Sequence, residues 1–409
     1  MSWLIRFARA LRHPNFAVYA AGNVLNLIGH WMQRIAVGWL TWQLTESATW
    51  LGIMTLAELG PTLLIGPLGG VLADRYPRIR IAQATQIAAA VQAGMLALLT
   101  LSGQLGIWSL LLLMLLQGVI FSLWQPVRLA LISSLVPRED LGSAVALNSV
   151  IFNSARFIGP ALAGVFLVAG GAGWVFVLHA CGLLGFWLAL SRLHIKEEPV
   201  LVVPGRRFGG ELLDGIRHVI HHPGMGPVLV LLIASCLLMR PVFELLPGFA
   251  EAVFQRGAHG LAILAAAPGV GAVLGGIWLG QRSSLIGLTR LMLQFTVVLA
   301  VVLMVFALTH WFWLAVLCLG LAGSALTVSG AGTQTLIQTA VDNAYRGRVL
   351  SLYGMVLRAG PAVGALIMGA TGDLIGLRWP LLTGCVLCLL VLFWVNQRRE
   401  QIRASLENP

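Results

Sequence analysis

Long runs of apolar residues separated by short polar breaks dominate this chain. Residues 81–127 and 291–341 contain no Asp, Glu, Lys or Arg, and each run is long enough for two bilayer-crossing helices of about 20 residues. The polar breaks SGQLG and TH divide these two runs. Backbone amides in hydrocarbon must be hydrogen-bonded within their own segment, and the runs lack the alternation over about ten residues that marks a membrane barrel. The pattern therefore predicts an all-α integral membrane protein.

Glycine, proline and charged residues mark the ends of twelve predicted transmembrane helices. The predicted spans are 16–43, 48–72, 81–101, 107–135, 142–168, 174–191, 225–251, 260–281, 290–308, 311–339, 348–373 and 379–396. A polar stretch divides them six and six, and its segment ELLDGIRHVI has one apolar helical face, which indicates an interfacial helix or else a plain linker. We predict an N-terminal six-helix bundle (1–192), a cytoplasmic linker with an interfacial helix (193–223) and a C-terminal six-helix bundle (224–409).

The positions of the basic residues predict the orientation of these spans. The chain is 58% apolar and only 10% charged, with a net charge of +11. Nineteen of its 26 Lys and Arg residues lie at the termini or in connections from even to odd spans, and only Arg256 and Arg378 lie on the opposite side. The positive-inside rule then makes both termini cytoplasmic. A nucleic-acid partner is not expected, because no soluble basic module is present. The five cysteines have no metal-ligand spacing, so neither a metal nor a cofactor is predicted.

The two halves of the chain repeat. LVPREDLGSAVALNS at 135–149 aligns with AVDNAYRGRVLSLYG at 340–354 at an offset of 205, which also places Gly159 on Gly364. Arg34 aligns with Arg240 at an offset of 206. Parallel halves of this kind are used by secondary transporters, which place their site near the bilayer midplane. The repeat therefore predicts two pseudo-symmetric six-helix bundles.

The segment GGVLADRYPRIR at 69–80 resembles the signature of the major facilitator superfamily between helices two and three. The matching residues are Gly70, Asp74, Arg75, Arg78 and Arg80, whereas Pro77 replaces the usual Gly. The resemblance implies a cytoplasmic latch in which Asp74 faces the amino-terminal end of span eleven, with Arg128 as a further partner. Alternatively, the arginines only enforce topology.

ARFIGPALAG at 155–164 is similar to a motif of the antiporters in this superfamily, with Ala155 and Ala163 in two of its Gly positions. Gly159 and Pro160 are expected to kink the fifth span there, because proline removes a backbone donor and small residues allow close helix approach. A purely structural kink is the alternative.

Three further segments look like the twelve-helix efflux branch of this superfamily, which includes enterobactin-type siderophore exporters and macrolide efflux pumps. They are GHWMQRIAVGWLTWQLTESATWLG, QPVRLALISSLVPREDLGSAVALNS and YRGRVLSLYG. The resemblance implies a monomeric, proton-coupled exporter in the bacterial inner membrane that works by alternating access. Its substrate would be an amphipathic or anionic small molecule such as a siderophore or drug. Import or flipping of an anionic metabolite or lipid is the alternative. An enzyme is not predicted, because HExxH, GxSxG and phosphate-cradling motifs are missing from the sequence.

Charged residues within the predicted spans are the strongest candidates for function, because each costs at least about 2.5 kcal/mol at mid-membrane. The set comprises Arg34, Arg156, Arg240, Arg358, Glu58 and Glu244. Arginines outnumber carboxylates, so we expect an anionic ligand, with Arg34 and Arg240 gripping it from the two bundles. Internal pairing is the alternative, for example of Arg240 with Glu244 one helical turn along. Proton coupling needs a group that changes charge, which favours the two glutamates. Glu58 is preferred because no arginine is near it in sequence.

Aromatic and amide side chains in the spans could complete a substrate pocket, although each could equally be a helix-contact residue. These candidates are Trp31, Gln33, Trp124, Gln125, Asn148, Asn153 and Gln334. His30 and His179 are expected to be hydrogen-bonding packing residues.

Overall fold

The computed structural model describes residues 9–193, 216–281, 287–342 and 345–407, without the side chains of 67–71, 73–74 and 129. The protein is all-helical, as predicted. It divides into two compact units, Met1–Thr45 with Ala57–Pro204, and Glu46–Leu56 with Gly205–Pro409.

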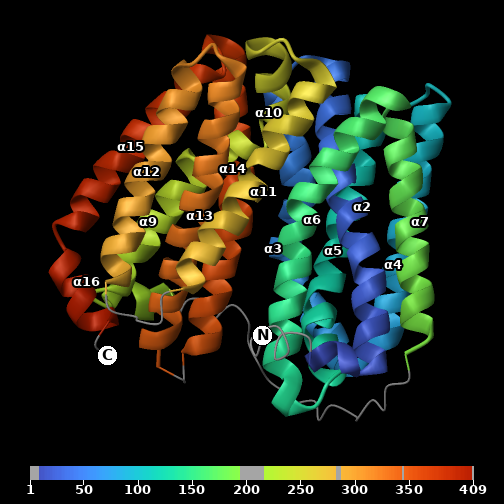
Figure 1. The fold of residues 1–409 in the computed structure, drawn as a ribbon, viewed down its shortest axis with the longest axis horizontal. Coiled ribbons are helices and arrows are strands. Elements are labelled where there is room, and N and C mark those ends of the chain that lie inside the picture. The colour runs from blue at the N-terminus through green and yellow to red at the C-terminus, as the bar shows by residue number, and fades with distance from the viewer. Residues whose placement is uncertain (1–8, 194–215, 282–286, 343–344, 408–409) are drawn as a thin grey trace. The chain divides into compact units, whose positions relative to one another are not determined.

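The first unit is a bundle of six long helices that follow a short 3-10 turn, Arg9–Arg12. Its helices are α2 (Pro14–Thr45), α3 (Ala48–Arg75), α4 (Arg78–Leu101), α5 (Ile107–Ser134), α6 (Leu141–Ala169) and α7 (Ala172–Ser191). Within this unit α2 packs against α6 and α7, and α4 packs against α5 and α7 (Figure 1). Phe16, Tyr19, Trp124 and Phe186 form the apolar core at one end of the bundle.

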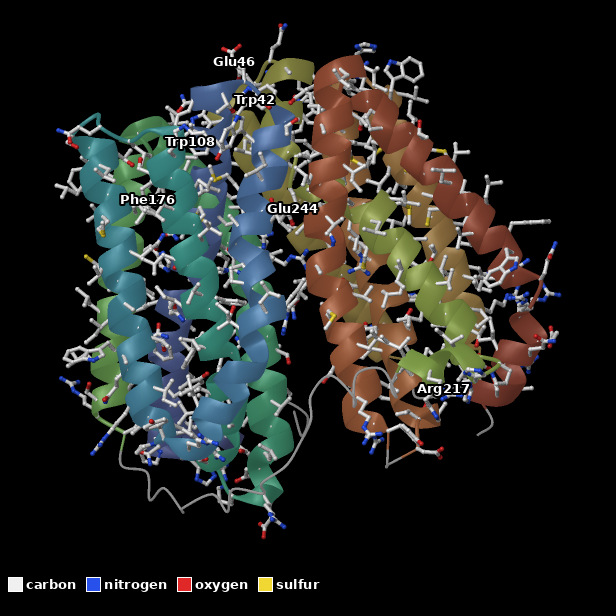
Figure 2. The ribbon with its side chains drawn as sticks, turned by 180° about the vertical axis from the view of Figure 1, so that it is seen from behind. Trp42, Glu46, Trp108, Phe176, Arg217 and Glu244 are labelled. Atoms are coloured by element: carbon white, nitrogen blue, oxygen red, sulfur yellow. The ribbon has the colours of Figure 1, made fainter. Side chains whose placement is uncertain are left out.

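The second unit has the same plan, except that its first span is broken. That span consists of α9 (Met225–Leu238), a 3-10 turn (Arg240–Phe243), the single turn α10 (Leu246–Gly248) and a π-helical turn (Phe249–Val253). The remaining helices are α11 (Gly257–Gly280), α12 (Leu288–Leu308), α13 (Phe312–Ala340), α14 (Arg346–Ile375), α15 (Arg378–Asn396) and the short α16 (Arg399–Leu406). Glu244 lies in the broken span, between Glu46 and Arg217, which lie at opposite ends of this unit (Figure 2).

Eleven helices in the described part of the chain are long and apolar enough to cross a membrane. They match the predicted spans two to twelve in position. The first predicted span, α2, is also long enough, but its mean hydropathy is lower because it carries polar residues such as Asn23, Asn26 and Gln33. Together with α2, the eleven helices agree with the predicted twelve-span fold.

The repeat predicted from the sequence is visible in the packing. In the first unit α2 contacts α6 and α7, and in the second the equivalent α9 contacts α14 and α15. Gly159 of α6 lies so close to α2 that an added Cβ would come within 2.5 Å of the Trp31 Cβ. The equivalent Gly364 of α14 lies equally close to Leu237 and Pro241. Both glycines therefore permit the same close helix approach in the two halves.

The boundary between the two units differs from the prediction at one place. Glu46–Leu56, at the start of α3, belongs to the second unit. Asp373 on α14 contacts this segment, and its carboxylate accepts hydrogen bonds from the backbone N–H groups of Ala48 (2.7 Å) and Thr49 (3.0 Å) and from the Ser47 hydroxyl (2.6 Å). A carboxylate at a helix N-terminus satisfies otherwise unpaired donors and interacts favourably with the helix dipole. The first residues of α3 are thus hydrogen-bonded to α14.

The predicted linker lies mostly outside the described residues. Residues 216–221 are helical, and within them Val219 is buried whereas Ile220 is exposed. The interfacial helix therefore stays a prediction.

Candidate substrate and coupling site

Two arginines of the first unit lie on one tryptophan. The Arg34 Cζ is 5.5 Å from the centre of the Trp31 ring, and the Arg156 Cζ is 5.6 Å from it. Trp31 and Arg34 are on α2, whereas Arg156 is on α6, which Gly159 brings close to α2. A guanidinium within about 6 Å of an aromatic ring gains about 0.5–2 kcal/mol, more where water is excluded. The cluster therefore concentrates two positive charges on an aromatic surface.

Glu58 completes this cluster. Its Oε2 lies 3.8 Å from the Arg34 Nε, with side chains 9% and 21% exposed. Glu58 has no arginine near it along the chain, but Arg34 lies beside it in space. Arg34 on α2 and Glu58 on α3 are far apart in sequence but adjacent in space. Removing one partner of a buried ion pair leaves the other charge uncompensated, so a change at Glu58 also affects Arg34.

A chain of hydrogen bonds crosses the interior of the same unit. The His179 Nδ1 is 2.8 Å from the Gln33 Oε1, Gln33 donates to the Gln92 Oε1 (3.4 Å), and Gln92 donates to the Leu113 carbonyl (3.2 Å). Gln33 and His179 are buried, so their side chains connect α2 to α4 and α7. His30 stacks on Phe121, with ring centres 5.9 Å apart. His179 is thus a hydrogen-bonding packing residue, as predicted.

The other candidates of the first unit are spread over different surroundings. Trp124 is buried in the apolar core against Phe186. Asn148 accepts a hydrogen bond from Asn23 (3.1 Å), and the exposed Asn153 donates to the carbonyl of its own helix at Ser149.

Gln125, like Trp124, is on α5, and it is half-buried. The structure therefore brings Trp31, Arg34, Arg156 and Glu58 together, and it places Gln33 and Trp124 in the bundle interior.

In the second unit Arg240 lies at the break of the first span. Pro241 has no N–H group, and the turn continues with the 3-10 bond from the Glu244 N–H to the Pro241 carbonyl (3.0 Å). Arg240 and Glu244 are therefore not one α-helical turn apart, because α9 ends at Leu238 and Arg240–Phe243 form a 3-10 turn. The Arg240 Nε is buried and has no hydrogen-bond partner among the described residues. Near it, the Tyr353 hydroxyl donates to the Gly330 carbonyl (3.3 Å).

The two remaining candidates of the second unit, Arg358 on α14 and Gln334 on α13, are exposed. Arg358 takes part in a further interaction, as do Arg34, Arg156 and Glu244.

The predicted latch is only partly described. Gly70 and Asp74 lie on α3, but the Asp74 side chain is outside the described part, so its contact with span eleven or Arg128 stays a prediction. The Arg128 Cζ lies 5.9 Å from the centre of the Phe152 ring.

The three other latch residues are at the connection between α3 and α4. Arg75 ends α3, Arg78 begins α4, and Arg75 and Arg80 are exposed. Pro160 lies within α6 beside Gly159, without interrupting the helix.

Sequence reasoning missed two polar side chains that organise the bundles, Gln92 and Asp373. Gln92 is an amide in a charge-free span, and Asp373 is an acid near the end of another span. Both could have been found by treating every polar residue in a span as a candidate contact. No group of three or more His, Cys, Asp or Glu residues that could hold a metal ion occurs among the described residues.

Comparison with known proteins identifies the family. The family model described as "Transmembrane secretion effector" matches residues 7–405, nearly the whole chain. The chain belongs to this family. Members of the transmembrane secretion effector family are transporters of the major facilitator type, so the resemblance inferred from the signature at 69–80 is confirmed.

Two curated relatives share most of the chain. The enterobactin exporter EntS of Shigella flexneri is 29% identical over 415 residues, which cover 99% of this chain and 98% of the relative. The enterobactin exporter EntS of Citrobacter koseri is 28% identical over 372 residues, which cover 91% and 88%.

Solved structures share the fold. A bacterial homologue of the human lysosomal transporter Spinster matches with a TM-score of 0.76 at 15% identity, covering 98% of this chain and 99% of that one. The xylose transporter XylE from E. coli matches with a TM-score of 0.68 at 16% identity, covering 96% and 99%. The protein is therefore a membrane-spanning transporter with the major facilitator fold.

Proposed function

We propose that this transporter exports an anionic, oxygen-rich small molecule, such as a siderophore, in exchange for protons across the bacterial inner membrane. The observation that carries the proposal is the cluster in which Arg34 and Arg156 lie on Trp31 with Glu58 beside Arg34. The names of the relatives, which are enterobactin exporters, support export and a siderophore substrate.

The cluster matches the chemistry of such a substrate. Guanidinium groups bind anionic oxygen atoms through paired, charge-assisted hydrogen bonds. Trp31 offers an aromatic face for the unsaturated part of the ligand. A molecule that chelates iron must present several oxygen donors, because hard cations prefer oxygen ligands. Arg34 and Arg156 would hold those oxygen atoms while Trp31 packs against the body of the molecule.

The interaction of Glu58 with the substrate determines whether protons are exchanged for the substrate or move together with it. If ionised Glu58 accepts hydrogen bonds from hydroxyl groups of the substrate, a proton on Glu58 removes its negative charge and turns one of its oxygen atoms into a donor, so proton and substrate compete. Competition is what exchange requires. If the substrate instead displaces Glu58 from Arg34, the freed carboxylate takes up a proton, and proton and substrate move together. We favour competition, because inward proton flow can then drive export.

The pH dependence of substrate affinity tests this mechanism. Enterobactin binding to the purified protein, followed by tryptophan fluorescence, should strengthen as the pH rises, by at most about tenfold per pH unit for a single competing proton. Glu58→Gln should remove this dependence. Because enterobactin also titrates, the comparison is between the wild type and Glu58→Gln, with Glu139→Gln at an exposed position as the matched control. Affinity that weakens with pH in the wild type only would indicate cotransport.

The direction of transport needs a separate measurement. In cells that make enterobactin but lack their own exporter, expression of this chain should restore enterobactin to the medium, and Arg34→Gln with Arg240→Gln should abolish that recovery. Accumulation of externally added enterobactin in the same cells would support import instead.

A further inference from the structure

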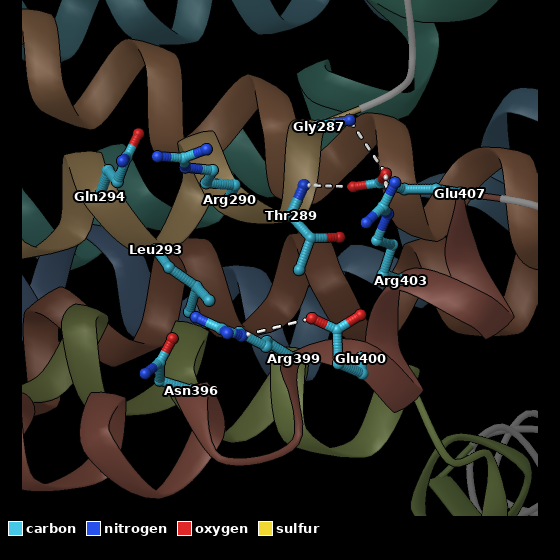
Figure 3. A pocket seen from close by; sticks show the side chains of 10 residues that line it. All are labelled: Gly287, Thr289, Arg290, Leu293, Gln294, Asn396, Arg399, Glu400, Arg403 and Glu407. Atoms are coloured by element: carbon cyan, nitrogen blue, oxygen red, sulfur yellow. Dashed lines mark hydrogen bonds and ion pairs between the residues drawn. The ribbon is translucent and has the colours of Figure 1, made fainter.

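A cationic pocket lies at the end of the second unit. It has a volume of about 530 Å³ and lies between the start of α12, the end of α15 and α16 (Figure 3). Three arginines line it, Arg290 from α12 and Arg399 and Arg403 from α16. Gln294, Asn396 and Leu293 also line it, together with Gly287, Thr289, Glu400 and Glu407. The pocket therefore offers guanidinium and amide donors to a single ligand.

One of its two carboxylates is already committed to the fold. Glu407 accepts hydrogen bonds from the backbone N–H groups of Gly287 (2.9 Å) and Thr289 (2.8 Å), and its side chain is 1% exposed (Figure 3). Burial by itself would raise the pKa of Glu407, but these hydrogen bonds and the nearby Arg403 outweigh it and hold the pKa below its usual value. Glu407 thus neutralises the start of α12 and fixes α16.

Positive charge remains after this pairing. Glu400 pairs with Arg399 at 3.4 Å, but both side chains are more than half exposed, and such pairs contribute little. Arg290 is exposed and makes no ion pair with any residue that the structure describes. Three guanidinium groups against two carboxylates leave the pocket with a net positive charge.

An apolar surface leads directly to this pocket. Val297, Val298 and Val301 on α12 are exposed, as are Leu390 and Phe393 on α15. Both helices are candidate membrane spans. With a rise of about 1.5 Å per residue, Val297 lies about 10 Å along α12 from Arg290. A charged group in the pocket could therefore be joined to hydrocarbon chains lying on α12 and α15.

The pocket also lies at the level where a span ends. Trp394, near the end of α15, is partly exposed, and the Arg398 Cζ lies 3.9 Å from the centre of its ring. Tryptophan and arginine at the end of a span are typical of the boundary between hydrocarbon and water. Phospholipid phosphates lie at this boundary, and basic pockets between transmembrane helices bind anionic headgroups.

We infer that the pocket lined by Arg290, Arg399 and Arg403 binds the phosphate of an anionic phospholipid whose acyl chains lie along α12 and α15. The phosphate contacts the guanidinium groups, and Gln294 and Asn396 bind the polar part of the headgroup. A free phosphate would use the same guanidinium groups but would gain nothing from the apolar surface.

Binding of phosphatidylglycerol to the full-length protein in a nonionic detergent, measured by native mass spectrometry, tests this site. Phosphatidylcholine with the same acyl chains is the neutral comparison, and inorganic phosphate is the soluble one. Phosphatidylglycerol should bind more tightly than phosphatidylcholine. Arg290→Gln and Arg399→Gln should each weaken phosphatidylglycerol binding by about fivefold, which corresponds to about 1 kcal/mol per arginine near a membrane surface.

Arg398→Gln is the matched control, because Arg398 is the neighbour of Arg399 but faces Trp394. It should leave phosphatidylglycerol binding unchanged. Arg290 makes no ion pair with the residues that the structure describes, so the Arg290→Gln variant should fold like the wild type. Equal phosphatidylglycerol binding by the wild type and Arg290→Gln/Arg399→Gln would overturn the inference. A second result would also overturn the inference. In it, inorganic phosphate stabilises the protein only when these arginines are present, and phosphatidylglycerol binds no better than phosphatidylcholine.

Discussion

The first spans of the two units occupy equivalent places but are built differently. Trp31 and Arg34 of α2 correspond at an offset of 206 to Leu237 and Arg240 in the second unit. Each span packs against an equivalent glycine, Gly159 or Gly364. Yet α2 is one continuous helix of 32 residues, whereas the second unit breaks at Arg240 into 3-10, α and π turns. The two first spans therefore share their contact with the glycine but differ in backbone conformation.

The chemistry of the two spans differs in the same way. Gln33 connects to His179 in the first unit, but its equivalent in the second is the fully buried Met239. Pro241 stands where the first unit has Ile35. Irregular backbone at membrane depth is tolerated only where it is covered by protein or lines a cavity. Transporters use such discontinuous helices at their sites. The first unit thus presents its candidate residues Trp31 and Arg34 on a regular helix, and the second presents Arg240 from an irregular one.

If both units depend on the close helix approach at the equivalent glycines, a larger side chain at either glycine should destabilise the protein to a similar extent. Gly159→Leu and Gly364→Leu should each destabilise the fold by about 1–3 kcal/mol, the usual cost of overpacking. The thermal unfolding of the purified proteins measures this. Gly142→Ala and Gly354→Ala, on the same two helices but facing open space, should have little effect. A large loss for only one of the two leucine variants would show that the halves do not pack equivalently.

The role of the helix break in the second unit can be tested with a substitution that favours a continuous helix. Proline inside a helix costs about 3 kcal/mol. If Pro241→Ala removes about half of this cost, the equilibrium between the broken and the continuous helix shifts toward the continuous helix by about tenfold. If the chain exports enterobactin as proposed, that export should fall accordingly, and hydrogen exchange of residues 237–246 should slow. Pro126→Ala in the continuous α5 provides the control. Unchanged export with slowed exchange would show that the break is not used in transport.

The polar Gln33 in the interior of the first unit can be replaced by methionine, the residue at the equivalent position of the second unit. Gln33→Met should destabilise the protein by about 1 kcal/mol, because it leaves the buried His179 Nδ1 without its partner. Adding His179→Leu to Gln33→Met should recover part of the loss, and the double-mutant cycle gives the coupling between the two side chains. Purely additive losses would contradict a direct interaction.

The smallest expected difference concerns the starts of α4 and α12, which are equivalent helices. α4 has no side-chain cap, whereas Glu407 caps α12. Because its folded pKa is below the ordinary value, Glu407 adds stability at neutral pH that is lost as the pH falls through that lowered pKa. Glu407→Gln should therefore lower the unfolding temperature at pH 7, by the equivalent of about 1 kcal/mol, and flatten its fall toward pH 4. An unchanged pH profile would exclude this role.

Much of the fold could be predicted from particular residues. Charge-free runs such as 81–127 required helices because unpaired amides are too costly in hydrocarbon. The offset that aligned Gly159 with Gly364 predicted matching contacts, and the structure has them. The candidate site was predicted less well. Arg34 and Arg156 were identified because charge is rare in spans, but Gln33 and Trp124 proved to lie in the interior.

The sequence alone determined that this chain is a twelve-span helical membrane protein with two related halves, because hydrophobic length and the need to satisfy backbone hydrogen bonds act locally along the chain. Only the tertiary structure decided that Glu58 lies beside Arg34, that Asp373 and Glu407 cap the starts of distant helices, and that Arg240 projects from a break. Those contacts join residues far apart in sequence, and their energies depend on distances of a few ångströms that no local pattern encodes.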